Sequence, residues 1–366
     1  MNVRKMPTKL LRDDHKAILK LCYGVTKEPK HAKRHYNRFI YRRNVLRTPR
    51  ISFTPPVFIA TIAENCNLAC PSCVYLLKDP DKFYSSFIDK NEFLRILEKH
   101  NKEKMAETIF LTGGEPLLHP EIDEIIDICK KFNLSTYIST NGILVKSRIA
   151  SMLKLDYVNV SVDSYDYETF KKNREGSPTQ FDLIRDGLKA LKENDIHFSM
   201  SYLLSRENMF EVYKMLDFAE SIEPDIVCFH NINPHGDERY RPLTMRDADV
   251  KLLLNKIVKR TDYPFDISLP VIFNIDSLSF DEGKCIQPWN YFCFNSKGDV
   301  SFCCHLAHSN NIGNVFTEYN YNSSEMVSFR RKIMENKRPD DCLYCQRRFF
   351  GKEYGCFSSR NKKWRF

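Results

Sequence analysis

The sequence predicts an α/β fold, namely a partial (β/α)6 TIM-like barrel followed by a small C-terminal cysteine-rich domain. Between residues 55 and about 235, short runs rich in β-forming residues alternate with longer amphipathic stretches. Six such units of strand and helix imply right-handed crossovers and a parallel sheet. After residue 240 the alternation fades, and from Cys285 onward we expect the cysteines to organise the fold by binding metal. A barrel that stops at six units would leave one side open for a bulky substrate.

The individual elements follow from two hydrophobic periods. Strands appear as short apolar runs with β-branched and aromatic residues, and helices carry apolar residues at three- and four-residue spacing. The six predicted strands are Val57–Ala63, Thr108–Thr112, Ser135–Ser139, Tyr157–Val162, His197–Leu204 and Ile226–Phe229. The predicted helices are Asn91–His100, Glu121–Phe132, Phe181–Glu193, Asn208–Glu220 and, later in the chain, Arg246–Arg260. Polar and glycine-rich residues stand just after the strands, at the ends where β/α folds bind ligands.

The 366 residues suffice for one large core and a smaller appendage. We divide them into a basic N-terminal extension (1–50), a core barrel (51–240), a connector (241–280) and the cysteine-rich domain (281–366). The extension holds fifteen Lys and Arg against three Asp and Glu, so the formal charge of +9 originates there. We expect it to be helical and to pack on the main domain with a solvated basic face. The alternative is an anionic partner: a membrane surface, a phosphorylated substrate or nucleic acid.

The sequence predicts a cytoplasmic protein. Its longest apolar stretches are too short to span a bilayer, and its N-terminus lacks the apolar region of a signal peptide. In a reducing compartment, clustered cysteines bind metal or do chemistry rather than form disulfides. Of the 13 cysteines, Cys22, Cys129 and Cys228 are isolated, and we expect them to be small buried apolar side chains.

Cys66, Cys70 and Cys73 form a C-x3-C-x2-C loop directly after a predicted strand. Three closely spaced thiolates suit a cubane of four irons, with one iron left open to chelate a small molecule. Zinc is the alternative, although a structural zinc site prefers four ligands in two closer pairs. The spacing resembles the defining loop of the radical S-adenosylmethionine (SAM) superfamily. This resemblance implies a [4Fe–4S] cluster that binds SAM and cleaves it reductively to a 5′-deoxyadenosyl radical.

Further segments resemble the motifs with which this family contacts SAM. A Gly-Gly-Glu-Pro segment would approach SAM with its backbone and offer a carboxylate to the methionine ammonium. A following Ser-Thr-Asn edge would face the ribose. The serine and aspartate of a Ser-Val-Asp segment would face SAM or substrate, and the arginine after it would pair with the methionine carboxylate. The alternative is strand-end caps and surface ion pairs. The family's aromatic residue before the third cysteine is Ser72 here, so adenine contact is expected farther on. The implied contacts are Gly113, Gly114, Glu115, Pro116, Ser139, Asn141, Ser161, Asp163, Arg174 and Tyr75.

The C-terminal cysteines resemble the SPASM/twitch extension of radical SAM enzymes. Cys285 and Cys303 keep a C-x12-G-x4-C spacing, and Cys342 with Cys345 forms a C-x2-C pair. The resemblance implies one auxiliary [4Fe–4S] cluster on these four ligands. A second cluster would need another cysteine where the chain has Gly351. A zinc ribbon on the same four cysteines is the alternative. Three cysteines remain, and each could be a spare ligand or a hydrogen-atom donor: Cys293, Cys304 and Cys356.

The resemblance implies hydrogen-atom abstraction by the adenosyl radical, with oxidation or remodelling assisted by the auxiliary cluster. Our first hypothesis is a small-molecule substrate: a sugar, cyclitol, nucleotide or lipid precursor. The second is a peptide maturase, against which the extension looks short for a separate leader-binding domain. The third is a non-catalytic iron–sulfur or zinc protein that binds nucleic acid. In the first two cases we expect an electron donor such as flavodoxin or ferredoxin.

Overall fold

The computed structural model describes residues 32–73, 86–232, 259–269, 285–304 and 311–337, with shorter pieces elsewhere. Those pieces are 243, 245, 248–249, 252–253, 257, 306, 342, 356–360 and 362–365. The predicted helix Arg246–Arg260 lies mostly outside the described residues. So do Tyr75, Cys345 and Cys22.

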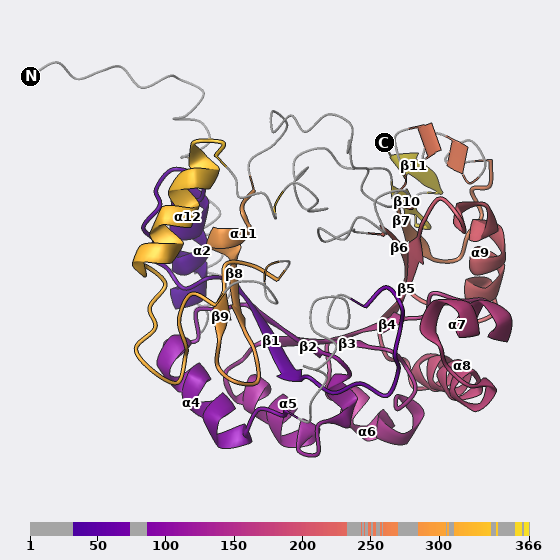
Figure 1. The fold of residues 1–366 in the computed structure, drawn as a ribbon, viewed down its shortest axis with the longest axis horizontal. Coiled ribbons are helices and arrows are strands. Elements are labelled where there is room, and N and C mark those ends of the chain that lie inside the picture. The colour runs from indigo at the N-terminus through magenta and orange to yellow at the C-terminus, as the bar shows by residue number, and fades with distance from the viewer. Residues whose placement is uncertain are drawn as a thin grey trace, which may run out of the picture.

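The described residues form one curved sheet of eleven strands in the order β11-β10-β7-β6-β5-β4-β3-β2-β1-β8-β9. Its central six strands are parallel neighbours. They are β1 (Val57–Ala63), β2 (Thr108–Gly113), β3 (Ser135–Thr140), β4 (Tyr157–Ser161), β5 (Phe198–Leu204) and β6 (Ile226–Asn231). The six predicted strands are thus confirmed, with ends that differ by at most two residues. In Figure 1 the sheet forms an arc rather than a closed ring, as a partial barrel predicts.

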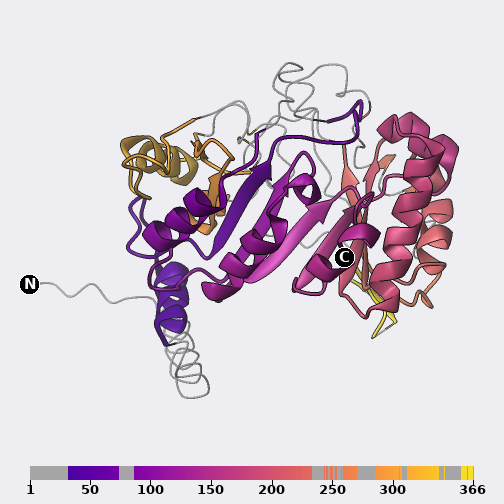
Figure 2. The ribbon, with the colours of Figure 1, turned by 90° about the horizontal axis from the view of Figure 1, so that it is seen from below.

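Helices cover the outer face of the arc, as Figures 1 and 2 show. The helices between the strands are α4 (Lys90–His100), α5 (Ile122–Lys131), α6 (Ile149–Met152), α7 (Tyr167–Arg174), α8 (Pro178–Glu193) and α9 (Val212–Glu220). Three 3-10 turns accompany them: η3 (Pro116–Leu118), η4 (Lys146–Arg148) and η5 (Met209–Glu211). Four of these helices match the predicted ones, because an apolar face repeats strongly in each. The short α6 and α7 had no such signal.

Each central strand presents one face to the helices and the other to the hollow of the arc, because successive side chains alternate. In β4 the buried residues are Val158 and Val160, and the intervening ones are only half-buried. The same alternation holds in β3. The outer-facing apolar residues join the helices in one large core. The inner face is therefore left with tyrosine, serine and asparagine side chains.

The sheet continues beyond the six predicted strands at both edges. On one side β7 (Asp266–Ser268), from the predicted connector, pairs with β6 in parallel, followed by antiparallel β10 (Cys356–Ser358) and β11 (Lys363–Arg365). On the other side β8 (Tyr291–Phe294) pairs with β1 in parallel and with β9 (Val300–Ser301) antiparallel. The sequence did not reveal the bounds of these strands, since they span only two to four residues.

The described end of the N-terminal extension is helix α2 (Ala32–Asn44), which packs on the main domain. Its Asn37 is buried and hydrogen-bonds both backbone groups of Thr54. Its Arg38 pairs with Glu107, which precedes β2. A packed helical extension is therefore confirmed for residues 32–44, and an anionic partner stays a prediction. No helix in the described part of the chain is long and apolar enough to cross a bilayer.

A second, smaller core joins the N-terminal segment to the C-terminal one. Helices α11 (Gln287–Asn290) and α12 (Ser324–Met334) enclose it. Its buried residues are Ile51, Phe53, Trp289, Cys303, Leu306, Phe329 and Ile333. The Trp289 indole donates to the carbonyl of Thr48 at 2.7 Å. Residues before β1 and after β7 thus share one packed unit.

Candidate functional site

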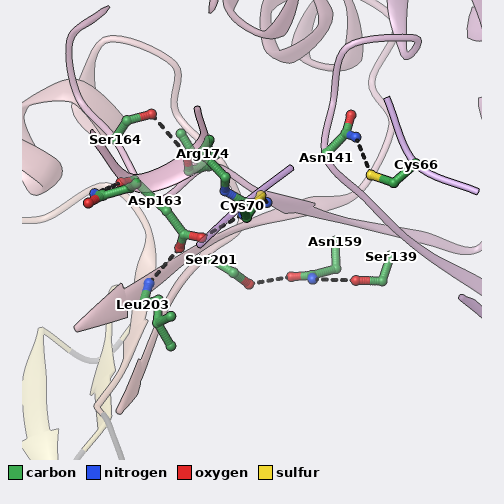
Figure 3. Close-up of polar contacts among 12 residues, drawn as sticks. Cys66, Cys70, Ser139, Asn141, Asn159, Asp163, Ser164, Arg174, Ser201 and Leu203 are labelled. Carbon is green, nitrogen blue, oxygen red and sulfur yellow. Dashed lines mark hydrogen bonds and ion pairs between the residues drawn. The ribbon is translucent and has the colours of Figure 1, made fainter. Parts of the chain in front are cut away.

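The C-x3-C-x2-C loop leaves the carboxyl end of β1, and the other predicted site residues follow the neighbouring strands. Gly113 ends β2, Asn141 follows β3, and Asp163 follows β4. Because parallel strands end at the same edge of the sheet, these segments gather there. Figure 3 shows Cys66, Cys70, Asn141, Asp163 and Arg174 close together at this edge. The structure thus brings together residues that are more than 100 positions apart in the chain.

Two of the three thiols in the loop receive N–H donors from other segments. The Asn141 amide donates to Cys66 Sγ at 3.7 Å, and the Arg174 guanidinium donates to Cys70 Sγ at 3.6 Å. Burial raises the pKa of the Cys66 thiol to about 11. Burial also raises the pKa of Cys70, opposed by the Arg174 charge. Donors aimed at sulfur suit anionic thiolates, so this donor set fits an iron–sulfur cluster. Among the described side chains, no three metal-binding groups are already gathered around one point.

Arg174 is nine-tenths buried and is held by Asp163. Its Nη2 lies 2.6 Å from Asp163 Oδ2. The other oxygen of Asp163 accepts a hydrogen bond from the backbone N–H of Leu203 on β5, at 2.6 Å. The Nε of Arg174 is buried without a hydrogen-bond partner. The guanidinium is therefore fixed between Asp163 and Cys70, with one donor still unused.

Glu115 is fully buried and accepts three hydrogen bonds from the protein itself. Its Oε1 accepts from the Thr140 hydroxyl at 2.8 Å and from Leu117 N at 3.0 Å. Its Oε2 accepts from Asn141 N at 2.7 Å. Burial raises the pKa of this carboxyl. In this structure Glu115 ties the end of β2 to the end of β3, and its pairing with a methionine ammonium stays a prediction. Pro116 beside it opens the turn η3 and is buried.

The two glycines before Glu115 allow the end of β2 to lie directly against the cysteine loop. A Cβ at Gly113, whose φ is +148°, would stand 1.8 Å from the carbonyl oxygen of Ala63. A Cβ at Gly114 would stand 2.4 Å from that of Asn65. Both contacts are with backbone, which cannot give way as a flexible side chain would. The glycines are therefore needed to place the loop that carries Cys66.

A polar network on the inner face of the sheet was missed by the sequence reasoning, apart from Ser139. Asn159 of β4 donates to Ser139 at 3.0 Å and accepts from Ser199 and Ser201 at 2.8 and 2.6 Å. Figure 3 shows part of this network beside Asp163 and Arg174. Ser161, which pairs with Ser201 in the sheet, is half-buried. The sequence does contain a signal for this network, because polar residues occupy alternate positions of β4 and β5.

Three aromatic rings stand side by side on the same inner face, across β2, β3 and β4. Phe110 meets Tyr137 edge-on with 5.0 Å between ring centroids, and Tyr137 lies 5.8 Å from Tyr157. Phe110 is 36% exposed although its strand is central in the sheet. The hollow of the arc therefore offers an apolar row near the polar network.

The C-terminal cysteines border the second core. Cys303 is part of it, and Cys285 and Cys342 pack against it. Three of the four predicted auxiliary ligands thus surround one small unit, and the fourth, Cys345, lies outside the described residues. Three thiols around one core fit a shared metal centre in type and placement. Among the isolated cysteines, Cys129 is fully buried as predicted, whereas Cys228 on β6 is only partly buried.

The parallel half-barrel with a cysteine loop at its carboxyl edge defines a β/α iron–sulfur protein. Comparison with known families makes this specific. Residues 61–219 match the Radical SAM superfamily, and residues 285–346 match SPASM, an iron–sulfur cluster-binding domain. The chain thus contains a radical SAM domain followed by a SPASM domain, as its motifs predicted. The cofactors of this class are a [4Fe–4S] cluster with SAM and auxiliary iron–sulfur clusters.

Individual relatives fall into two groups by how much of the chain they match. The Fe-coproporphyrin III synthase of Methanosarcina barkeri is 26% identical over 180 residues, which are 48% of this chain and 44% of that protein. The antilisterial bacteriocin subtilosin biosynthesis protein AlbA of Bacillus subtilis is 23% identical over 304 residues, which are 81% of this chain and 66% of AlbA. The matched parts thus span roughly half to two thirds of these curated relatives.

Solved structures agree on the fold. Streptococcus suis SuiB bound to SAM superposes with a TM-score of 0.63 at 17% identity, over 86% of this chain and 76% of SuiB. SuiB bound to its precursor peptide SuiA gives a TM-score of 0.62 at 16% identity, over 95% of this chain and 77% of SuiB. At such identities the likeness shows the fold alone.

Proposed function

We propose that this chain is an enzyme that cleaves SAM reductively on a cluster held by Cys66, Cys70 and Cys73 and abstracts a hydrogen atom from its substrate. When bound, the cluster and SAM supply the electron and the radical. The observation that supports this most is the pair of N–H donors aimed at Cys66 and Cys70 at the carboxyl edge of the sheet. Such donors stabilise thiolate and tune the potential of the iron they ligate.

The protein's own contribution is to bind and orient SAM. We assign the unused Nε donor of Arg174 to the methionine carboxylate, because a guanidinium already fixed by Asp163 loses little entropy on binding. Ser161 at the end of β4 lies on the same edge. The glycine pair and Pro116 hold the loop in place, and Glu115 braces Asn141. We propose that Ser139 and Asn141 face the ribose of SAM and that the segment around Tyr75 contacts the adenine.

We further propose one auxiliary [4Fe–4S] cluster on Cys285, Cys303, Cys342 and Cys345, and a flavodoxin or ferredoxin as electron donor. Three of these cysteines border one small core, which supports a shared centre. The division into segments 1–50, 51–240, 241–280 and 281–366 stays part of the proposal. The sheet crosses these boundaries, because β7 of the connector and β8 of the C-terminal segment both extend the barrel wall.

The substrate we propose is a peptide, rather than the small molecule that the sequence favoured first. Fe-coproporphyrin III synthase matches only 48% of the chain, a share close to that of the barrel alone. AlbA, named for biosynthesis of the bacteriocin subtilosin, matches 81% and must include part of the C-terminal segment. SuiB, whose fold covers 95% of the chain, was solved with a precursor peptide. An inner face with a half-open aromatic row suits a peptide side chain.

The proposal is tested in two steps with anaerobically reconstituted full-length protein. First, SAM and dithionite should yield 5′-deoxyadenosine with the wild type but not with Cys70→Ala. Second, co-expression with short peptides encoded beside its gene, followed by mass spectrometry, should reveal a mass change that Cys70→Ala abolishes. Absence of 5′-deoxyadenosine from protein with full iron and sulfide would refute the radical chemistry. Radical formation without any modified peptide, but with turnover of a small molecule, would return the substrate to the first hypothesis.

A further inference from the structure

Arg330 of α12 is a buried cation, and no acidic side chain in the described part of the chain pairs with it. Its side chain is 1% exposed. Its Nε donates to the carbonyl of Pro288 at 2.9 Å, and its Nη1 donates to the carbonyls of Tyr321 at 2.7 Å and Pro49 at 3.2 Å. Burial lowers its pKa to about 10, so the group stays charged at neutral pH. Among the ion pairs within the described residues, none joins Arg330 to an Asp or Glu.

A buried charge of this kind is costly, so a compensating negative group is expected beside it. The contrast within the same chain is Arg174, which is buried to a similar degree but paired with Asp163 at 2.6 Å. Neutral carbonyls satisfy the hydrogen bonds of Arg330 but leave its net charge uncompensated.

The predicted auxiliary ligands border the second core, to which the helix of Arg330 contributes. Its helix contributes Phe329 and Ile333 to the second core, and Trp289 follows the Pro288 carbonyl that Arg330 binds. Cys285, Cys303 and Cys342 border that same core. Cys285 precedes Pro288 by three residues, a stretch of chain that reaches at most about 11 Å. Four thiolates around an iron–sulfur cubane carry a net negative charge.

We propose that Arg330 is the counter-charge of the auxiliary cluster and raises its reduction potential. This inference rests on the proposed auxiliary cluster but not on the identity of the substrate. A unit positive charge near the cluster favours addition of an electron, and we expect it to change the reduction equilibrium by a factor of about ten. For a one-electron couple, this factor corresponds to about 59 mV. Arg330 would thus make the auxiliary cluster, when bound, easier to reduce.

The test compares auxiliary-cluster potentials in full-length protein that carries Cys66→Ala, Cys70→Ala and Cys73→Ala, so that the first cluster gives no signal. Two neutral variants, Arg330→Gln and Arg330→Met, are compared with the charge-retaining Arg330→Lys. Arg331→Gln is the matched control, because it removes an equal charge from the exposed neighbouring position. Midpoint potentials are read by EPR during redox titration, after iron and sulfide analysis. Thermal unfolding of each variant is measured before and after cluster reconstitution.

The neutral variants should lower the midpoint by about 59 mV, a tenfold shift, while Arg330→Lys and Arg331→Gln should leave it near the reference. Reconstitution should also raise the unfolding temperature less in the neutral variants, because they lack the charge that the cluster compensates. A purely structural arginine would lower both unfolding temperatures alike and leave the midpoint unchanged, which would overturn the inference. If the reference protein binds no auxiliary cluster, that part of the proposed function fails too, whereas an unchanged midpoint in loaded protein refutes only the role of Arg330.

Discussion

The ion pair between Asp163 and Arg174 should be a large single contribution to the stability of the site, and Asp163→Asn tests it. Asparagine keeps the side-chain oxygen that accepts from Leu203 N. It also tolerates the left-handed backbone of this position, where φ is 52°. The substitution therefore removes the charge and places an amide N–H, in place of the accepting oxygen, beside Arg174. The buried guanidinium then keeps its positive charge with Cys70 as its remaining polar contact.

The size of the effect follows from burial. The side chains of Asp163 and Arg174 are 16% and 11% exposed. Removing one partner of a buried pair costs about 3–5 kcal/mol, because it leaves an unpaired buried charge. Since both side chains keep some contact with solvent, we expect about 2–4 kcal/mol of lost unfolding free energy.

Urea denaturation followed by far-UV circular dichroism measures this loss. The matched control is Asp186→Asn, which breaks the ion pair between Asp186 and Lys146. Both of these side chains are about half exposed. That pair should contribute less than about 1 kcal/mol. Equal urea midpoints for Asp163→Asn, Asp186→Asn and the wild type would refute the claim that the site is braced by a buried ion pair.

Three further outcomes are expected. Gly114→Ala should cost about 1–3 kcal/mol in urea unfolding and lower the iron content after reconstitution, because its Cβ would stand 2.4 Å from the carbonyl of Asn65; full iron loading would contradict this. His100 is neutral when folded, because burial lowers its pKa from 6.5 to about 4, so it takes up a proton on unfolding between these values. Acidification from pH 7 to 5 should therefore remove up to about 2 kcal/mol, and His100→Phe should show a shallower pH dependence of the urea midpoint. Phe110→Ala should slow peptide modification about tenfold or more while 5′-deoxyadenosine still forms, whereas Phe210→Ala, at an exposed position, should be neutral.

The sequence was sufficient for the central strands because each is a run of five to seven residues, and four of the five connections between them contain a helix with a clear period. It was insufficient for β7 and β8, since three or four residues are too few to display a period. The cysteine loop was evident from spacing alone. Its supporting donors, Asn141 and Arg174, came from resemblance, and the structure then showed how they reach the sulfurs.

Other parts of the site depend on tertiary neighbours. Asn159 interacts with Ser139 of one adjacent strand and Ser199 of the other, and the alternating polar residues of β4 and β5 do not by themselves identify these partners. The partners of Glu115 could not be foreseen either, because its two oxygens bind groups about 25 residues downstream. The lone Arg330 was hidden for a similar reason: its burial arises only when the N-terminal and C-terminal segments meet.

The pairing of β1 with β8 has a consequence for how the protein is made. On the ribosome, β1 emerges more than 200 residues before the strand that covers its free edge. Until then β1 is an open edge strand, available for pairing with another chain. The Glu64 side chain, just after β1, likewise lacks the hydrogen bond from the Ser296 hydroxyl until that residue has been synthesised. The loop that begins at Cys66 is thus completed late in synthesis, and a chain truncated before β8 should aggregate rather than yield an independent barrel.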